Sequence, residues 1–332
     1  MYYYCTLFDS FYLSRGVAMY ESLKRTTQDF HLYIFAFDDI SCDVLKKMKL
    51  EYVTIVSLKE FETPELLEVK KIRTIAEYCW TCTPSTISYV LKKYDVPNCT
   101  YIDSDLCFFS DPAILIQELE ESRKSVLITE HRFSTLPKLY EEKRAGRFCV
   151  QFITFLNEEE SMQVLECWRA QCIEWCYARY EDGKFGDQKY LDLWPVTYSN
   201  IHILEHPGGG IAPWNLTDYR FSRESESLSG KNKKDGSRFY LVFYHFQYVR
   251  FMEGGLCDIG WYYISTANKN IFYKPYLHEI IKIENRIREL NSDYKHGISV
   301  FNTDGLKNKF KTALKKIIGY NILNLYTNGI SY

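Results

Sequence analysis

The 332-residue sequence has no uninterrupted apolar run of ~18 residues, so we expect no helix to span a membrane. Its first residues, MYYYCTLFDS, lack the basic segment of a secretory signal, which predicts a cytoplasmic protein. The eleven cysteines are odd in number and irregularly spaced, which argues against a disulfide framework and favours a reducing compartment. The single CxxC, Cys79 to Cys82, closes a predicted helical stretch, so we expect no redox or zinc chemistry there.

The sequence also lacks a strong overall charge, because its formal net charge is only −2. That charge is unevenly spread. Residues 268–332 contain eleven Lys and Arg against five Asp and Glu, a balance of +6, which leaves −8 for the first 267 residues. The acidic body argues against nucleic acid as its main partner. We therefore predict a main domain over residues 1–265 and a basic helical extension over residues 266–332.

Predicted strands and helices alternate along the first hundred residues. The strands are expected at 2–8, 31–37, 52–58 and 99–103, and the helices at 12–24, 41–50, 66–82 and 84–94. Further strands are expected at 125–130, 148–156 and 238–249, with a long helix at 158–180. The Gly/Ser/Lys-rich stretch 222–238 is typical of a flexible connection. This alternation predicts an α/β fold with an open, mostly parallel sheet flanked by helices.

Two carboxylates follow the predicted strand at 99–103. In the stretch YIDSDLCFF, Asp103 and Asp105 are two residues apart, so in extended backbone they point the same way. The carboxyl ends of strands are where open α/β sheets bind ligands. Convergent carboxylates repel each other unless a cation or a proton lies between them, and no Lys or Arg is adjacent in sequence. A hard divalent cation, Mg²⁺ or Mn²⁺, would relieve this repulsion and would also bind phosphate oxygens.

Around this pair the sequence resembles the nucleotide-sugar glycosyltransferases of the GT-A fold, in particular the retaining family 8 that includes glycogenin-like and bacterial galactosyltransferases. The YIDSD stretch is preceded by a helix with Lys70, Lys71 and Arg73. Four further stretches match in the same order: TLFDSFYLSRG (6–16), FCVQFITFLN (148–157), FGDQKYLDLWP (185–195) and YHFQYVRF (244–251). The resemblance covers roughly residues 1–255 and is specific because of this order.

The resemblance implies a role for each matching residue. Asp103, Asp105 and His245 would hold the metal, Mn²⁺ or Mg²⁺, which would neutralise the departing diphosphate. Thr6 and Asp9 would contact the nucleoside, and Lys70 and Arg73 would lie against the phosphates. Asp187 and Gln188 would face the donor sugar near its reacting carbon, and Gln151 would hydrogen-bond that sugar. Arg250 stands where the family has a lysine that reaches the diphosphate.

Several of these residues also have structural interpretations. Asp187 follows a glycine and is equally suited to cap a helix, and His245 could be a satisfied core histidine. Lys70 and Arg73 could lie on a solvated helix face. In HPGGGIAPWN (206–215), the three glycines indicate a sharp turn or a close backbone approach to a ligand. His206 and Trp214 are candidates for the acceptor site, and the alternative is a tight connection with a buried tryptophan.

The C-terminal stretch from Leu306 has apolar residues at helical spacing, with lysines on the other side. The apolar positions are Leu306, Phe310, Leu314 and Ile317, and the lysines are Lys307, Lys311, Lys315 and Lys316. Such a helix over residues 306–326 could lie on the inner face of an anionic membrane. The alternative is a helix that packs on the body with its lysines in water.

The sequence therefore predicts a metal-dependent glycosyltransferase. It would move a hexose from a nucleotide diphosphate sugar, most simply UDP-linked, to a glycan or lipid-linked glycan acceptor, and the resemblance implies retention of anomeric configuration. A sugar nucleotidyltransferase is the first alternative, although the stretch after the first strand, Phe8 to Tyr12, is not the Gly-rich basic loop of that class. The second alternative is a catalytically inactive glycan-binding protein.

Overall fold

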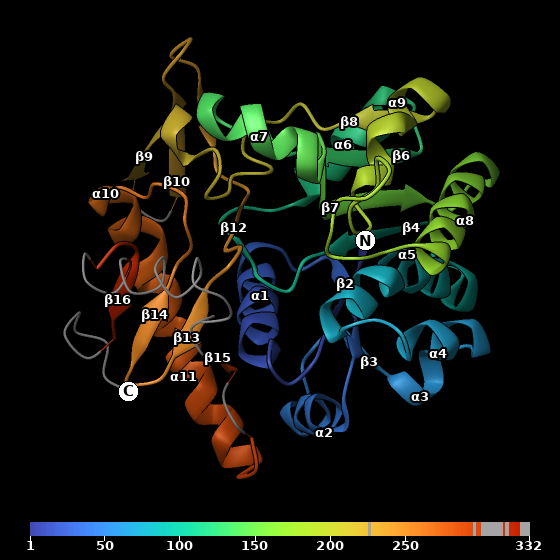
Figure 1. The fold of residues 1–332 in the computed structure, drawn as a ribbon, viewed down its shortest axis with the longest axis horizontal. Helices are drawn as coiled ribbons and strands as arrows, with labels where there is room; N and C mark the ends of the chain where they lie inside the picture. The colour runs from blue at the N-terminus through green and yellow to red at the C-terminus, as the bar shows by residue number, and fades with distance from the viewer. Residues whose placement is uncertain (225–226, 295–296, 300–314, 316–318, 326–332) are drawn as a thin grey trace.

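A computed structural model describes residues 1–224, 227–294, 297–299, 315 and 319–325 (Figure 1). Its centre is a seven-stranded sheet with the order β3-β2-β1-β4-β7-β6-β8. The strands are β1 (Tyr2–Phe8), β2 (Phe30–Ala36), β3 (Val53–Ser57), β4 (Asn98–Ile102), β6 (Val126–Glu130), β7 (Phe148–Leu156) and β8 (Ile201–Ile203). All run in one direction except β7, which is antiparallel to both of its neighbours. The predicted α/β class with an open, mostly parallel sheet is confirmed.

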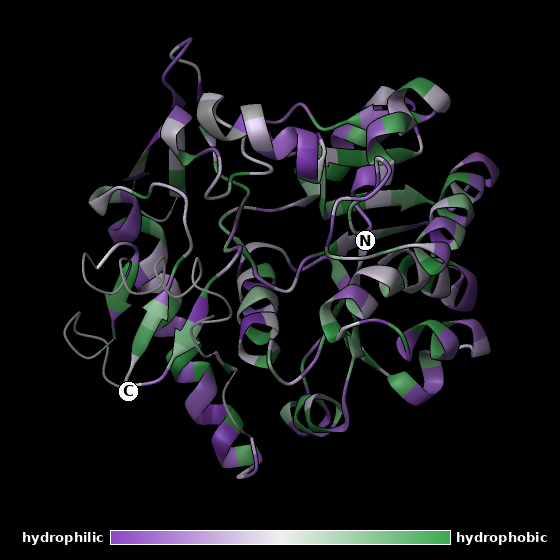
Figure 2. Cartoon of the chain, viewed as in Figure 1, coloured by the Kyte–Doolittle hydropathy of each residue, from purple (hydrophilic) through white to green (hydrophobic). Residues whose placement is uncertain are grey.

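Helices cover both faces of this sheet because successive strand residues point to opposite sides. In β1, Tyr4 and Phe8 pack in one hydrophobic cluster, whereas Cys5 and Leu7 pack in the other. The first cluster includes α1 (Leu13–Thr26), α2 (Asp39–Met48) and α6 (Ala113–Ser122). The second includes α3 (Leu58–Phe61), α4 (Pro64–Lys70), α5 (Ile75–Tyr94), α8 (Glu159–Glu174) and α9 (Trp194–Thr197). Figure 2 shows hydrophobic residues along the central strands and mixed colouring along the surrounding helices.

Two helix predictions were wrong in detail. The helix predicted over 41–50 begins earlier, because Asp38 caps it by accepting from the Ser41 backbone N–H, so Ser41 lies inside the first turn. The helices predicted at 66–82 and 84–94 are instead α4 and a twenty-residue α5 that contains Pro84. A proline inside a helix removes one backbone hydrogen bond. Helix α5 tolerates this loss because its central residues are buried, and tertiary packing outweighs local propensity.

The stretch predicted as a flexible connection is a second, three-stranded antiparallel sheet. It consists of β9 (Tyr219–Glu224), β10 (Ser227–Asn232) and β11 (Arg238–Tyr240), preceded by the short helix η2 (Leu216–Asp218). Gly230 was read as a loop residue, but a Cβ there would lie 2.3 Å from the Phe239 ring, so the glycine makes room for a core side chain. The strand predicted over 238–249 is divided between β11 and β12 (Phe243–His245), which belong to different sheets.

The remaining elements lie beside the domain. Strand β12 pairs with β5 (Leu106–Phe108), and α7 (Thr135–Ala145) and the 3₁₀ turn η1 (Lys189–Leu193) flank the main sheet. After β13 (Arg250–Met252) and β14 (Leu256–Asp258) come α10 (Thr266–Asn268), the π-helix η3 (Lys269–Tyr273) and α11 (Lys274–Leu290). Strands β15 (Ile298–Ser299) and β16 (Ile322–Asn324) then pair with β13 and β14. The C-terminal segment thus supplies strands to a sheet that begins before residue 265, and the proposed boundary stays a prediction.

Most of the predicted basic helix at 306–326 lies outside the described residues, but Lys315 is described. Its side chain is 1% exposed and forms an ion pair with Asp258. Its ammonium also donates to the Gly260 carbonyl over 2.8 Å and lies 4.2 Å from the centre of the Trp261 ring. Burial lowers the pKa of Lys315. The expectation that Lys315 faces water or a membrane was therefore wrong. Within the described residues, no helix has the length and hydrophobicity needed to cross a bilayer.

Candidate metal centre

The two aspartates lie where β4 ends and β5 has not yet begun. Asp103 directly follows β4, and the backbone N–H of Leu106 donates to the Asp103 carbonyl over 3.2 Å, which closes a tight turn between the strands. Asp103 is fixed to β7 because its backbone N–H donates to the Gln151 carbonyl over 3.0 Å. The turn therefore presents both carboxylates at the carboxyl end of a central strand, where α/β sheets bind ligands.

The short ladder between β5 and β12 brings His245 to this turn. His245 is paired with Leu106, and the backbone N–H of Phe246 donates to the Asp105 carbonyl over 2.9 Å. The His245 Nε2 atom lies 3.0 Å from Asp105 Oδ1 and 3.6 Å from Asp103 Oδ2. One ligand atom from each residue lies within 4.8 Å of the others. The structure thus brings together the three residues that the sequence predicted as metal ligands.

The other imidazole nitrogen of His245 is occupied. His245 Nδ1 lies 2.7 Å from the Gln151 side-chain oxygen, an acceptor, so this nitrogen carries the proton and Nε2 faces the carboxylates. Histidines that bind metals usually have this kind of partner, which fixes the tautomer and the ring orientation. The geometry supports a role for Gln151 that sequence reasoning missed. Its predicted contact with the donor sugar stays a prediction, because the side chain is 0% exposed, and its buried amide Nε2 has no hydrogen-bond partner among the described residues.

The electrostatics of the three residues fit a bound cation. Burial, together with the charge of Asp105, raises the pKa of Asp103 to about 6. Burial would also raise the pKa of Asp105, but the neighbouring His245 outweighs it and holds that pKa below its usual value. The two carboxylates in turn raise the pKa of His245 well above normal, although burial opposes this. The carboxylates thus favour a positive charge beside them, on the protonated His245 ring or on a cation that takes the place of its proton. Two carboxylates and an imidazole form a donor set suited to Mn²⁺ or Mg²⁺.

Asp187 is a buried neighbour of this site. Burial, and next the charge of Asp103, raise the pKa of the Asp187 carboxyl to about 8. Its backbone carbonyl accepts from Trp168 Nε1 over 2.9 Å, which holds the chain in place. Gln188 donates its side-chain amide to the Ala145 carbonyl at the end of α7 over 2.6 Å. The predicted contacts of Asp187 and Gln188 with a donor sugar remain predictions.

The two residues predicted to contact the nucleoside lie in β1 and directly after it. The Asp9 carboxylate accepts from the backbone N–H of Tyr12 over 3.2 Å, and burial raises its pKa. Thr6 lies inside β1 with 0% exposure, so its side chain does not reach a surface in this structure. Arg250 stacks over Tyr248, with 4.2 Å between the guanidinium carbon and the ring centre. Burial raises the pKa of the Tyr12 hydroxyl, and the charges of Asp105 and Asp9 add to this shift, whereas those of Arg15 and Arg250 oppose it.

The two basic residues predicted at the phosphates have other partners here. Arg73 is buried, and its guanidinium donates to the Cys172 and Ile173 carbonyls over 2.6 and 2.7 Å, and also to the Thr81 hydroxyl. These carbonyls belong to the last turn of α8, so Arg73 satisfies helix-end groups that otherwise lack partners. Lys70 forms an ion pair with Glu62 over 2.6 Å and is 41% exposed. The predicted contacts of Arg73 and Lys70 with phosphates stay predictions, and the observed hydrogen bonds and ion pair do not support them.

Of the two predicted acceptor residues, Trp214 is buried and His206 is half-buried. Trp214 is only 5% exposed, donates from Nε1 to the His131 carbonyl over 2.6 Å, and meets the His245 ring edge-on at 5.4 Å. His206 donates its backbone N–H to Glu118 over 2.9 Å. The neighbouring glycines pack against protein: a Cβ on Gly208 would lie 2.1 Å from the Tyr240 carbonyl. The geometry favours the interpretation of a tight connection with a buried tryptophan.

Arg15 is a buried cation that sequence reasoning missed. It donates to the Phe11 carbonyl over 2.8 Å and to the Val249 carbonyl over 3.0 Å. Its guanidinium carbon lies 4.7 Å from the centre of the Tyr12 ring. It therefore joins the loop after β1 to the chain that follows His245, and its charge helps to lower the pKa of Asp105. The only sequence signal was a charged residue within the apolar start of α1.

Comparison with known protein sequences identifies the family of this chain. The chain is 30% identical over 305 residues to the uncharacterized protein YfnD of Bacillus subtilis (strain 168), and the match covers 89% of this chain and 94% of YfnD. The chain belongs to the YfnD family. Within this family, it is also 31% identical over 256 residues to the uncharacterized protein YfnF of the same organism, with 75% of this chain and 82% of YfnF covered. No protein-family profile matches the chain.

Two solved structures have a more distant similarity to this member of the YfnD family. Mouse xyloside xylosyltransferase 1 is 13% identical with a TM-score of 0.43, and the match covers 64% of this chain and 87% of that one. The galactosyltransferase LgtC, in complex with donor and acceptor sugar analogs, is 9% identical with a TM-score of 0.45, with 73% and 86% covered.

Proposed function

We propose that this member of the YfnD family is a metal-dependent glycosyltransferase. It would move a hexose from a nucleotide diphosphate sugar, UDP-linked, to a glycan or lipid-linked glycan, with retention of anomeric configuration. The observation that carries the proposal is the convergence of Asp103, Asp105 and His245 at the carboxyl end of β4. The order of motifs over residues 1–255, which resembles family 8 enzymes, supports the same function.

Each residue of the site would have a separate role. Asp103, Asp105 and His245 would hold the Mn²⁺ or Mg²⁺ ion, and Gln151 would keep the His245 ring oriented. When bound, the cation supplies Lewis-acid neutralisation of the diphosphate leaving group. Asp103 is the most exposed of the three side chains, 28% against 13% for Asp105 and 7% for His245, which favours it as the group nearest the donor. Arg250 would place a further positive charge near the diphosphate.

The environment of Asp187 favours a positioning role for its carboxyl group. An inverting enzyme needs an ionised carboxylate that accepts a proton from the acceptor hydroxyl. A carboxyl with a pKa of about 8 is mostly protonated at neutral pH, so it would donate a hydrogen bond to a sugar hydroxyl. Burial is the larger cause of this shift, and it persists when a cation offsets the charge of Asp103. Asp187 would therefore position the donor sugar, which is compatible with the proposed retention.

A nucleotide-sugar screen tests the function. Thermal unfolding of the purified full-length protein would be measured with UDP-, GDP- and CDP-sugars, each with Mn²⁺ and with EDTA. We expect one UDP-sugar to stabilise the protein only with the metal. Ligand at 100 times its Kd contributes about 2.7 kcal/mol of stability. The UDP-sugar that stabilises the protein should also be hydrolysed slowly to free sugar and UDP when the metal is present. No shift with any nucleotide-sugar would contradict the proposal, and pyrophosphate-dependent turnover would favour the nucleotidyltransferase.

A further inference from the structure

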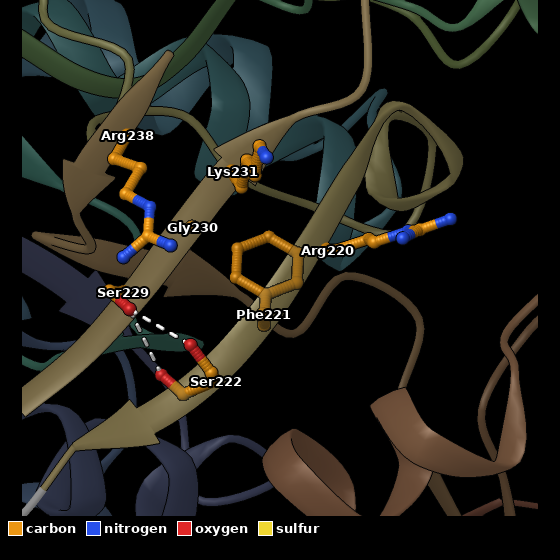
Figure 3. Close-up of a pocket in the computed structure, with 7 residues that line it drawn as sticks. All are labelled: Arg220, Phe221, Ser222, Ser229, Gly230, Lys231 and Arg238. Carbon is orange, nitrogen blue, oxygen red and sulfur yellow. Dashed lines mark hydrogen bonds between the residues drawn. The ribbon is translucent and has the colours of Figure 1, made fainter. Parts of the chain in front are cut away.

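The outer sheet β9–β10–β11 places three cations in one row. In the strand register, Lys231 on β10 is paired with Arg220 on β9 and with Arg238 on β11. Paired residues on neighbouring strands point to the same face. All three side chains are exposed. Figure 3 shows them on three adjacent strands.

The pattern of the sheet fixes these cations on its outer face. The next row, one residue along each strand, contains Phe221, Gly230 and Phe239. Phe239 is buried in the main hydrophobic cluster, and Phe221 packs against that cluster. Since alternate residues point to opposite faces, burying the two phenylalanines forces the three cations to face outward together. Like charges directly opposite each other weaken a sheet.

In the part of the chain that the structure describes, no carboxylate neutralises the positive charge of these three residues. No ion pair within 4.0 Å joins Arg220, Lys231 or Arg238 to any described acid. Among the described acids near these strands, Asp218 accepts from the Thr217 hydroxyl over 3.5 Å, and Asp235 accepts from the Ser237 hydroxyl over 2.6 Å. The repulsion is therefore not relieved by any described side chain, and an external anion would relieve it.

Hydroxyl groups and a shallow cavity lie beside the cations. Ser222 and Ser229 occupy the neighbouring row on the same face, with 3.0 Å between their hydroxyl oxygens. A cavity of about 150 Å³ is lined by these serines and the three cations, together with Phe221 and Gly230 of the adjacent row. Water occupies ~30 Å³ per molecule in the liquid, so this volume can accept a phosphate group. In Figure 3 the Arg238 guanidinium turns toward β10, whereas Arg220 extends away from the sheet.

We propose that this face of β9–β11 binds the phosphate groups of a linear polyanion. Arginine and hydroxyl groups are strong donors to phosphate oxygens. Strands are spaced ~4.8 Å apart, so the cations form a line about 10 Å long, which suits successive phosphates on a chain. Adsorption to a membrane would need apolar side chains beside the cations, and Tyr240 is the one exposed aromatic residue of this face. The site is independent of the proposed transferase activity.

Binding of inorganic polyphosphate tests the proposal. Isothermal titration calorimetry would use the full-length protein in EDTA, so that the metal centre contributes no cation, at 50 and 200 mM NaCl. The test variant is R220Q/K231Q/R238Q. Its matched control, K46Q/K49Q/K59Q, removes the same charge from exposed lysines elsewhere. We expect saturable binding by the wild type, at least tenfold weaker binding by the test variant, and less than a twofold change in the control.

Salt dependence adds a second readout. Each phosphate contact that is lost should reduce the slope of log K against log salt by ~1, so the test variant should lose two to three units of slope. Because the three residues are exposed, circular dichroism should remain unchanged. Equal losses in both triple variants, or no saturable binding by the wild type, would overturn the proposal. Stronger, R220/K231/R238-dependent binding to phosphatidylglycerol vesicles than to polyphosphate would assign the face to a membrane instead.

Discussion

Replacing Asp105 with Asn should abolish metal-dependent turnover of the nucleotide-sugar while leaving the fold intact. We expect at least a 10³-fold loss of kcat/KM, or about 4 kcal/mol of transition-state stabilisation. Of the two carboxylates, Asp105 lies nearer to His245 Nε2, at 3.0 Å against 3.6 Å for Asp103, and it provides one of the two negative charges of the site. A neutral amide is a weak ligand for a hard cation, so the Asn variant should fail to hold the ion that offsets diphosphate charge.

The control for this variant is Asp182→Asn. Asp182 is exposed, and its φ of 49° is a conformation that asparagine tolerates. Mn²⁺ affinity from calorimetry and initial rates at saturating metal would be measured for both variants. Asp182→Asn should match the wild type in both. Unchanged turnover by Asp105→Asn, with wild-type metal dependence, would remove Asp105 from the site.

Replacing Arg73 with Met should lower the free energy of unfolding by about 2–4 kcal/mol, because the variant leaves helix-end carbonyls of α8 buried and unpaired. The methionine keeps much of the side-chain volume but none of the three hydrogen bonds to Thr81, Cys172 and Ile173. Urea denaturation would measure this change. Lys70→Met is the comparison, since it removes an exposed ion pair of at most ~1 kcal/mol.

Donor kinetics of Arg73→Met separate the two roles considered for this residue. If Arg73 acts only on α8, KM for the nucleotide-sugar should stay within about threefold of wild type at a temperature where the variant is folded. If it contacts the phosphates, as the sequence resemblance implies, one lost charged hydrogen bond of about 1.5–3 kcal/mol should raise KM more than tenfold. A stable variant with a raised KM would contradict the structural role.

The sequence was informative where a local pattern of residues determines the structure. The alternation of strands and helices predicts the parallel sheet. The two carboxylates after a buried strand predict a ligand-binding site at the edge of that sheet. Asp103 and Asp105 are neighbours in sequence, so their convergence follows from strand geometry alone. His245 is 140 residues from Asp105, and only the order of motifs linked the two. The β5–β12 ladder that joins them in space is three residue pairs long.

Other contacts could not be predicted because they depend on packing between distant segments. Nothing in sequence indicates that Arg73 reaches the end of α8, or that Lys315 is buried against Asp258. The β9–β11 sheet was missed because glycine, serine and lysine are usually loop residues. There the alternation of Phe221 and Phe239 with charged neighbours was the stronger signal. Gln151 was assigned to a sugar, whereas the described contact is to His245.

The most direct measurement is anomalous scattering at the manganese edge from crystals grown with Mn²⁺ and UDP. The account predicts one strong anomalous peak within coordination distance of the Asp103 and Asp105 carboxylates and of His245 Nε2, with the diphosphate completing the coordination. A peak elsewhere, or no peak while both carboxylates point away from the diphosphate, would contradict it.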